Sequence, residues 1–335
     1  MPLHPTKGDC REFGYEPDAQ WAKLPTGLSW PEVVGIATDR QDRVYVFNRG
    51  EHPVVVFDRD GSFLSSWGEG QFVRPHGITI GPDDAVWCAD DNDHTVRKFT
   101  PDGRPQITLG TSGRPSDTGA TSMDYRNVRR AGPPFHYPTN LAVAPDGNLY
   151  VSDGYGNACV HVFSPDGRHL HSWGEPGAGP GQFHLPHGIA VDRRGTVYVA
   201  DRENSRVQLF NLKGQYLSEW ADVARPCQVF VWDDHVYVAE LGFLAGRWPG
   251  NPEPPADAPG GRLSVFDQEG KLLARWGGGR NPCAAGDFFA PHGVCVDSRG
   301  DVYVGEVVMS GGGNQGLVPP TCHSLQKFTR REVPN

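Results

Sequence analysis

Three histidines recur in one sequence context, and their spacing could make a metal site. Each follows a proline and precedes a glycine and an alternating apolar run, as at His76, His187 and His292. The same context occurs three more times with a different residue in the histidine position, namely Glu32, Thr139 and Cys227. Histidine therefore takes every second repeat. If six repeats close into a ring, three imidazoles at threefold spacing leave a fourth metal position for water or substrate, as in catalytic zinc sites.

Zn²⁺ is the metal that neutral imidazoles in this arrangement suit, although Fe²⁺, Co²⁺ and Mn²⁺ accept the same ligand type. A lone Pro-His-Gly step would favour another interpretation, a turn residue packed at the mouth of a pore. Three such steps in alternate repeats favour a metal. His94, His136 and His184 lie outside the repeat position, and we expect them to be surface or supporting residues.

The repeat itself predicts the fold. Residues 186–220 contain four short alternating runs rich in Val, Ile, Tyr and Phe, separated by turns of the Asp-Arg-Arg-Gly kind. Such runs are typical of β-strands and hairpins. Four strands in roughly 40–45 residues is the period of a propeller blade. We therefore predict an all-β, six-bladed β-propeller formed by a single domain over residues 1–335.

The ends of the chain are predicted to complete one blade together. Several fourth strands end in tryptophan, but the chain ends soon after a third strand. Residues 14–24 also contain a run that ends in tryptophan. They are expected to supply the missing fourth strand of blade six (288–329). Closure of the ring in this way removes open sheet edges.

Meander topology places the histidine turn and the loop after strand two on the same face. The long insertions also belong to this face, at 110–134, 242–261 and 307–322, whereas the opposite face keeps short turns. An elaborated face that carries candidate ligands is where function is expected.

Strand two ends in an acid or amide in every blade, and such a recurring residue is best explained as a structural cap of loop N–H groups. The residues that follow it are more informative. Arg49 and Arg202 suit a substrate carboxylate, or else form salt bridges at the rim. Tyr155 occupies the same loop position in blade three. Two interpretations are open for it: a general base that is activated by a metal and an arginine, or an aromatic residue that stacks at the mouth of the pore.

Composition excludes some classes of function. The net charge of −9 and the lack of a Lys/Arg-rich block argue against a nucleic-acid partner. The sequence has no apolar run of membrane-spanning length and no signal-peptide pattern at its start. Seven scattered cysteines form no CxxC pair, so we expect a reduced, cytoplasmic protein with free thiols.

Residues 137–210 resemble the amidating lyase domain of peptidylglycine α-amidating enzymes, which are six-bladed propellers of the NHL-repeat class. The stretches SDGYGN and PHGIAV followed by VADREN carry the likeness. The resemblance implies a catalytic zinc on His76, His187 and His292. It also implies a catalytic tyrosine at Tyr155 and active-site arginines at Arg49 and Arg202. The implied reaction cleaves a C-terminal α-hydroxyglycine into an amide and glyoxylate.

The chain departs from this family at several positions. The resemblance implies a calcium ion held by backbone near Val33 and Ile78 and by an aspartate after the third histidine. That position is Gly293 here, so Ca²⁺ is not carried over. Gly156 replaces a family cysteine, and Glu306 and the glycine-rich 311–316 have no counterpart.

We therefore expect a metal-dependent lyase for an N-acyl hemiaminal, an α-hydroxyglycine or a ureidoglycolate-like molecule, with a small-molecule or peptide C-terminal substrate. Two alternatives stay open. One is a metal-dependent hydrolase or lactonase using the same pore site, and the other is a non-enzymatic NHL propeller that binds proteins.

Overall fold

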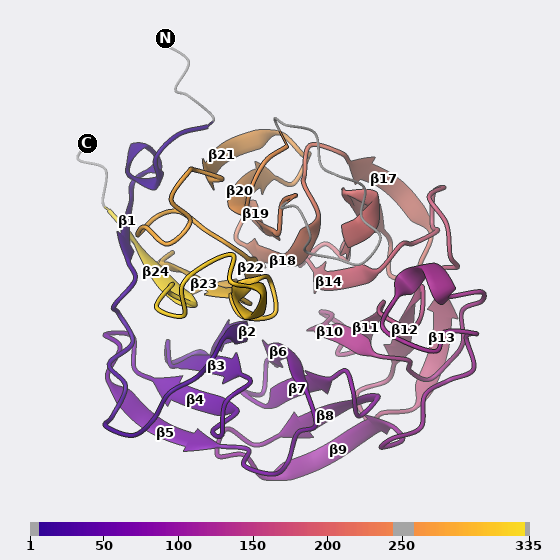
Figure 1. Ribbon diagram of the computed structural model, residues 1–335. Helices are drawn as coiled ribbons and strands as arrows, with labels where there is room; N and C mark the ends of the chain where they lie inside the picture. Colours follow the sequence, from indigo (N-terminus) through magenta and orange to yellow (C-terminus); the bar gives the residue numbers. More distant parts are fainter. Residues whose placement is uncertain (1–6, 244–257, 332–335) are drawn as a thin grey trace. The chain divides into compact units, whose positions relative to one another are not determined.

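The computed structural model describes residues 7–243 and 258–331. Within these residues lie six four-stranded antiparallel sheets, each in meander order, and the protein is an all-β, six-bladed β-propeller (Figure 1). The chain divides into two compact units, Trp67–Val229 and the combination of Met1–Ser66 with Phe230–Asn335. The single domain expected over 1–335 stays a prediction.

The strands are short, as the alternating runs predict. Blades one and two comprise β2 (Val33–Thr38), β3 (Val44–Asn48), β4 (Val54–Phe57), β5 (Phe63–Trp67), β6 (Pro75–Ile80), β7 (Val86–Asp90), β8 (Thr95–Phe99) and β9 (Pro105–Gly110). Blades three and four comprise β10 (Pro138–Val143), β11 (Leu149–Asp153), β12 (Cys159–Phe163), β13 (His169–Trp173), β14 (Pro186–Val191), β15 (Val197–Asp201), β16 (Arg206–Phe210) and β17 (Tyr216–Trp220). Blades five and six comprise β18 (Pro226–Trp232), β19 (His235–Glu240), β20 (Arg262–Asp267), β21 (Leu272–Gly277), β22 (Pro291–Val296), β23 (Val302–Glu306), β24 (Leu325–Arg330) and β1 (Tyr15–Asp18).

The N-terminal strand completes the last blade, which confirms the predicted closure. Strand β1 pairs antiparallel with β24, and the order of this sheet is β1-β24-β23-β22 (Figure 1). The hydroxyl of Tyr15 lies 3.1 Å from that of Tyr237 in blade five. The outer edge of β24 is thus covered by a strand from the other end of the chain.

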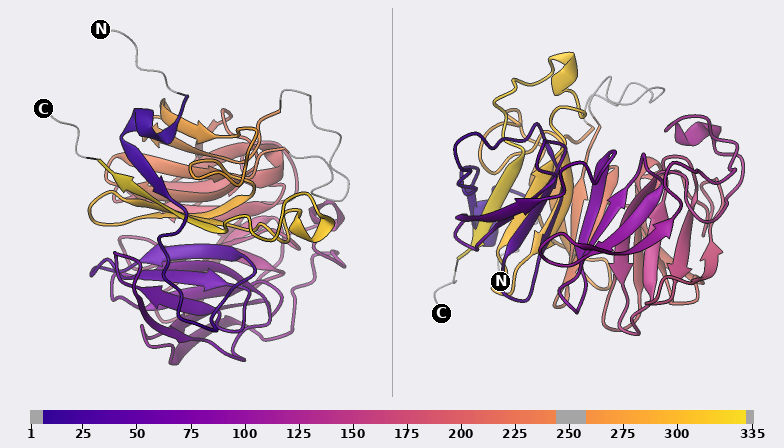
Figure 2. Two further views of the ribbon diagram at one scale, coloured as in Figure 1. Left: turned by 60° about the vertical axis from the view of Figure 1, so that its left-hand side comes forward. Right: turned by 90° about the horizontal axis from the view of Figure 1, so that it is seen from below.

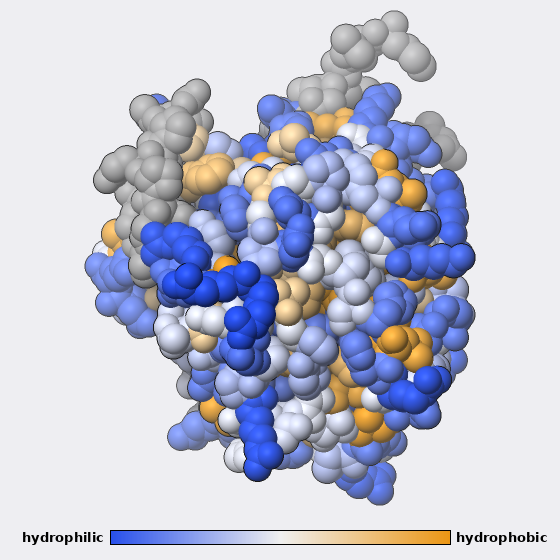
Figure 3. All heavy atoms as spheres, turned by 90° about the vertical axis from the view of Figure 1, so that its right-hand side faces the viewer, coloured by the Kyte–Doolittle hydropathy of each residue, from blue (hydrophilic) through white to orange (hydrophobic). Residues whose placement is uncertain are grey.

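Burial follows the order of strands within a blade. Five of the six second strands, such as β15, are buried at every residue, and β19 is partly exposed only at its first residue, His235. The outer strand β17 is exposed at all but its last residue, Trp220. Figure 3 shows a face on which hydrophilic residues predominate and apolar ones are scattered. Leu170 and Leu217 are exposed on outer strands. The described part of the chain contains no helix with the length and apolar character of a membrane span.

Two of the three predicted insertions are described. The segment 110–134 runs from the end of β9 toward the start of β10 and contains the 3-10 helix η2 (Tyr125–Asn127). The segment 307–322 connects β23 to β24 and contains η4 (Gly313–Gln315), which projects beyond the strand ends of blade six (Figure 2). Most of the third insertion, 242–261, lies outside the described residues.

Two cysteines are bonded to each other, which corrects the prediction of free thiols at these two positions. Cys283 and Cys322 form a disulfide that ties the end of the 307–322 segment to the loop before β22. This pair could not be predicted from the sequence, because the two cysteines are 39 residues apart and lie in irregular segments. Disulfides persist mainly in oxidising compartments. The cytoplasmic location stays a prediction.

Replacing Cys283 and Cys322 by serine is expected to lower the free energy of unfolding by about 2–4 kcal/mol, because the unfolded chain loses a cross-link. Urea denaturation followed by circular dichroism measures the difference. Reductant should bring the wild-type protein to the stability of the double variant. A wild-type protein indifferent to reductant would contradict the assignment of this bond.

Candidate metal centre

Two of the repeat histidines lie side by side in the unit Trp67–Val229. His76 and His187 follow the first residue of β6 and β14, and both are almost fully buried. Their ring centroids are 4.8 Å apart. Each imidazole is fixed by the backbone of the next blade, because Nδ1 lies 2.7 Å from the carbonyl oxygen of Thr139 for His76 and of Cys227 for His187.

These bonds determine which nitrogen of each ring can bind a metal. A carbonyl oxygen only accepts, so Nδ1 carries the proton in the neutral imidazole and the lone pair is on Nε2. A metal-binding histidine in proteins commonly makes such a bond through its other nitrogen. His76 and His187 therefore have the tautomer and the orientation of metal ligands.

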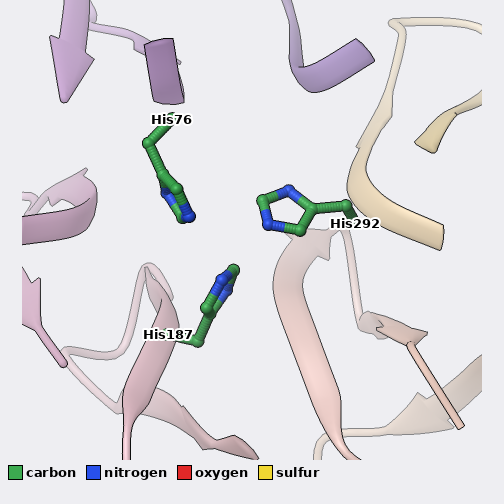
Figure 4. Close-up of side chains that lie close together, drawn as sticks. All are labelled: His76, His187 and His292. Atoms are coloured by element: carbon green, nitrogen blue, oxygen red, sulfur yellow. The ribbon is translucent and has the colours of Figure 1, made fainter. Parts of the chain in front are cut away.

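The third histidine has the same local arrangement in the other unit. His292 is buried in β22, and its Nδ1 lies 2.7 Å from the carbonyl oxygen of Val34. His76, His187 and His292 form the candidate set of metal-binding nitrogens that Figure 4 draws. Three neutral imidazoles fit Zn²⁺ and the other divalent transition metals named above.

Only glycine fits sterically at the third position of the Pro-His-Gly motif. A Cβ atom at Gly77 would lie 2.5 Å from the carbonyl oxygen of Thr139, and one at Gly188 would lie 2.5 Å from that of Cys227. These are the carbonyl groups that hold the histidines. Only glycine lets the neighbouring backbone approach closely enough to bond with the preceding imidazole.

Position 293 does not suit the calcium ligand that the family implies. Gly293 has no carboxylate, and a Cβ there would lie 2.9 Å from the Cα of Gly35. The close approach of blade one leaves no space for an aspartate side chain without a backbone shift. The residues present therefore do not fit the calcium site of the resembled family.

Tyr155 lies beside both histidines of its unit. Its hydroxyl oxygen is 3.3 Å from Nε2 of His76 and 3.2 Å from Nε2 of His187. Arg202 donates to the same oxygen from Nη1 at 3.1 Å, and its guanidinium carbon is 5.2 Å from the centre of the phenol ring. Four of the six predicted site residues are thus brought together here.

Arg202 is held in place by a buried carboxylate that the sequence analysis did not select. Glu203 Oε1 accepts from Nε of Arg202 at 2.8 Å and from Nη2 of Arg225 at 2.8 Å. Burial alone would raise the pKa of Glu203, but the two guanidinium groups hold it below its ordinary value. Burial likewise opposes the charge of Arg202, yet Tyr155 and Glu203 raise the pKa of its guanidinium above the ordinary value.

A second cationic side chain near Tyr155 was also not predicted from the sequence. Arg74 pairs with Asp91, and its guanidinium carbon lies 6.0 Å from the centre of the Tyr155 ring. Arg74 and Arg225 each stand directly before the proline of a repeat motif. That shared position, found in blades two and five, is the sequence signal that could have identified them.

Arg49 lies in the other unit, in an ion pair. Its Nη1 donates to Oε1 of Glu32 at 2.6 Å and to the hydroxyl of Ser310 at 3.2 Å. Glu32, the residue in the histidine position of blade one, also accepts from the backbone N–H of Ser310 at 2.8 Å. The rim salt bridge considered from the sequence is therefore present, and it anchors the 307–322 segment.

The acids that end the second strands make structural contacts. Asp90 accepts from the backbone N–H groups of Val73 and Arg74, and Glu306 accepts from those of Phe289 and Ala290. In each case the N–H groups belong to the segment that leads into the histidine motif. These carboxylates therefore hold the turn that carries the histidine.

Comparison with known proteins identifies the family. A model of the NHL repeat matches residues 135–163 and 183–210. Mouse NHL repeat-containing protein 3 is 32% identical over 288 residues, which cover 79% of this chain and 73% of that protein. The chain belongs to the NHL-repeat family.

This NHL-repeat chain is also a homologue of amidating enzymes. Rat peptidylglycine alpha-amidating monooxygenase is 31% identical over 255 residues, which cover 62% of this chain and 25% of that protein. Peptidyl-alpha-hydroxyglycine alpha-amidating lyase 1 of Drosophila melanogaster is 35% identical over 162 residues, which cover 45% of this chain and 27% of that protein. The chain spans about a quarter of the length of these two relatives.

Solved structures agree on the fold of the NHL-repeat chain. A gluconolactonase from Xanthomonas campestris superposes with a TM-score of 0.59 and 13% sequence identity, over 90% of this chain and 86% of that one. At this identity the likeness concerns the propeller alone.

Replacing His187 by alanine is expected to weaken Zn²⁺ binding by more than about 10-fold, because loss even of a partner that only orients a ligand costs about 10–100-fold. Competition with a chelating dye measures the affinity. His184→Ala is the matched control, since His184 stacks on Tyr125 outside the repeat position. Equal zinc affinity in the two variants would contradict a ligand role for His187.

Proposed function

We propose that this chain is a metal-dependent lyase that cleaves the carbon–nitrogen bond of an N-acyl hemiaminal. Its substrate would be a peptide with a C-terminal α-hydroxyglycine or a small ureidoglycolate-like molecule, and its products an amide and glyoxylate or a related carbonyl compound. The observation that carries the proposal is the hydroxyl of Tyr155, within 3.3 Å of Nε2 of His76 and His187 and within 3.1 Å of Arg202. The homology to an enzyme named as an amidating lyase supports the same class of reaction.

In this proposal His76, His187 and His292 hold the metal through Nε2. The carbonyl bonds to the three Nδ1 atoms support the assignment, because they orient each ring before any ion binds. We expect Zn²⁺, and other divalent transition metals accept the same ligands. When bound, such an ion supplies a Lewis acid for a substrate oxygen.

Tyr155 acts as the general base in the proposed reaction. As phenolate, it takes the proton of the substrate hydroxyl, and the new carbonyl forms as the electron pair of the carbon–nitrogen bond moves to the amide nitrogen. That nitrogen then takes a proton, so one proton passes from oxygen to nitrogen and no water is consumed. Arg202 stabilises the phenolate, and the burial of both side chains keeps this charge interaction strong.

Arginine side chains also bind the carboxylate group of the substrate in this proposal. A glyoxylate-forming substrate carries a carboxylate next to the reacting carbon, and the planar donors of a guanidinium match its two oxygens. We assign this role to Arg202 and Arg49. Glu203 and Glu32 position these two arginines through the ion pairs described above.

Replacing Tyr155 by phenylalanine is expected to lower kcat by about 10²–10⁴, the usual contribution of a positioned acid or base. Glyoxylate release from α-hydroxyhippurate by the zinc-loaded protein measures the rate, and elemental analysis should find the metal content unchanged. Tyr125→Phe is the control, because Tyr125 is a partly buried tyrosine of η2 that contacts His184.

Three results separate the proposal from its alternatives. Retained activity in Tyr155→Phe would remove the base role. Hydrolysis of lactones without glyoxylate release from hemiaminals would indicate a hydrolase instead. A purified protein that binds no divalent metal would indicate a non-enzymatic interaction module.

A further inference from the structure

A second group of side chains that could bind a metal lies in blade three, and it includes none of the three repeat histidines. Asp153 ends β11, and Cys159 and His161 belong to the neighbouring strand β12. Nε2 of His161 is 3.3 Å from Oδ2 of Asp153 and 3.3 Å from Sγ of Cys159. All three side chains are buried. Nothing in the proposed reaction uses them.

Blade three differs at this acid from three of the other blades. The corresponding acid pairs with an arginine of strand three in blades two, four and five, as Asp90 with Arg97, Asp201 with Arg206 and Glu240 with Arg262. The strand register aligns Cys159 with Asp153 in the same way as Arg206 with Asp201. Cysteine therefore stands where blade four has a permanent cation.

The charge of Asp153 is consequently left without a permanent partner. Among residues 7–243 and 258–331, its one ion-pair contact is His161. Oδ2 also accepts from the backbone N–H of His136 and from the amide of Asn157, both at 2.8 Å. Oδ1 is buried and has no hydrogen-bond partner in the described part of the chain. A buried oxygen that lacks a partner keeps its full desolvation penalty, so the site needs a further positive group.

We propose that Asp153, Cys159 and His161 bind a structural zinc-class divalent cation between β11 and β12. Carboxylate, thiolate and imidazole are the ligand types that Zn²⁺ takes. The separations of 3.3 Å between ligand atoms match the edges of a tetrahedron whose metal–ligand bonds are about 2.0–2.3 Å. The cation supplies to blade three the charge that arginine supplies to blades two, four and five.

Contacts around the ligands orient them for this role. Nδ1 of His161 lies 2.7 Å from the hydroxyl of Ser172 on β13, which leaves Nε2 to face Asp153 and Cys159. The ring of Phe135 packs edge to face with the imidazole, with the ring centroids 5.4 Å apart. Cys159 binds as the thiolate, and its proton passes to the solvent when the metal binds. Because the ligands are buried, the ion is bound as the blade folds.

The test uses Co²⁺, which reports thiolate ligands by an intense near-ultraviolet charge-transfer absorption. The protein is produced in Co²⁺-containing medium, and its spectrum and cobalt content are measured. The wild-type protein should show the thiolate band, and Cys159→Ser should lose it together with one cobalt ion per chain. Cys88→Ser, at an equally buried free cysteine of blade two, should keep both.

A second variant keeps the test valid if Cys159→Ser does not fold. His161→Gln introduces the residue that blade four has at the equivalent place, Gln208, which bonds to Asp201. It should fold, as judged by circular dichroism, and lose one cobalt ion per chain. A wild-type protein without the thiolate band, or a band that survives Cys159→Ser, would overturn the site. A site of histidines alone, such as His76 and His187, gives no thiolate band.

Discussion

The hydrogen bond from a histidine Nδ1 to a backbone carbonyl of the next blade is the contact on which the site depends. It occurs at His76, His187 and His292, each time at 2.7 Å. It fixes the tautomer, aims Nε2 and requires the glycine that follows, since any larger residue would push the two blades apart. A sheet-forming sequence thereby orients the candidate metal ligands without a dedicated loop.

A chain of alternating charges supports the phenol of Tyr155, the proposed base. The phenol of Tyr155 contacts Arg202, Arg202 contacts Glu203, and Glu203 contacts Arg225. Each member is buried or nearly so, so removing one would leave an uncompensated charge in a medium of low dielectric. The arrangement ties the position of the proposed base to residues of two successive repeats, Arg202 after β15 and Arg225 before β18.

The sequence predicted those features that repeat. Six copies of one pattern made it possible to predict the blades, the closing strand and the three histidines, and homology confirmed the NHL-repeat family. Features that do not recur in most repeats could not be predicted from the sequence. Glu203 binds Arg225, which is 22 residues away, and the bond between Cys283 and Cys322 joins two irregular loops. Arg74 shares its position before a repeat proline with Arg225 alone among the six repeats, so this signal was too sparse to select it. Cys159 and His161 became informative only when strand register aligned them with the arginines of other blades.

The pairing of β1 with β24 has a consequence for the order of events during synthesis. The unit Trp67–Val229 is continuous in sequence, and it contains His76, Tyr155, His187 and Arg202. The other unit needs segments from both ends of the chain, because Tyr15–Asp18 finds its partner only in Leu325–Arg330. A nascent chain can therefore assemble most of its reactive groups while still on the ribosome, but its first strand waits for the last one to emerge.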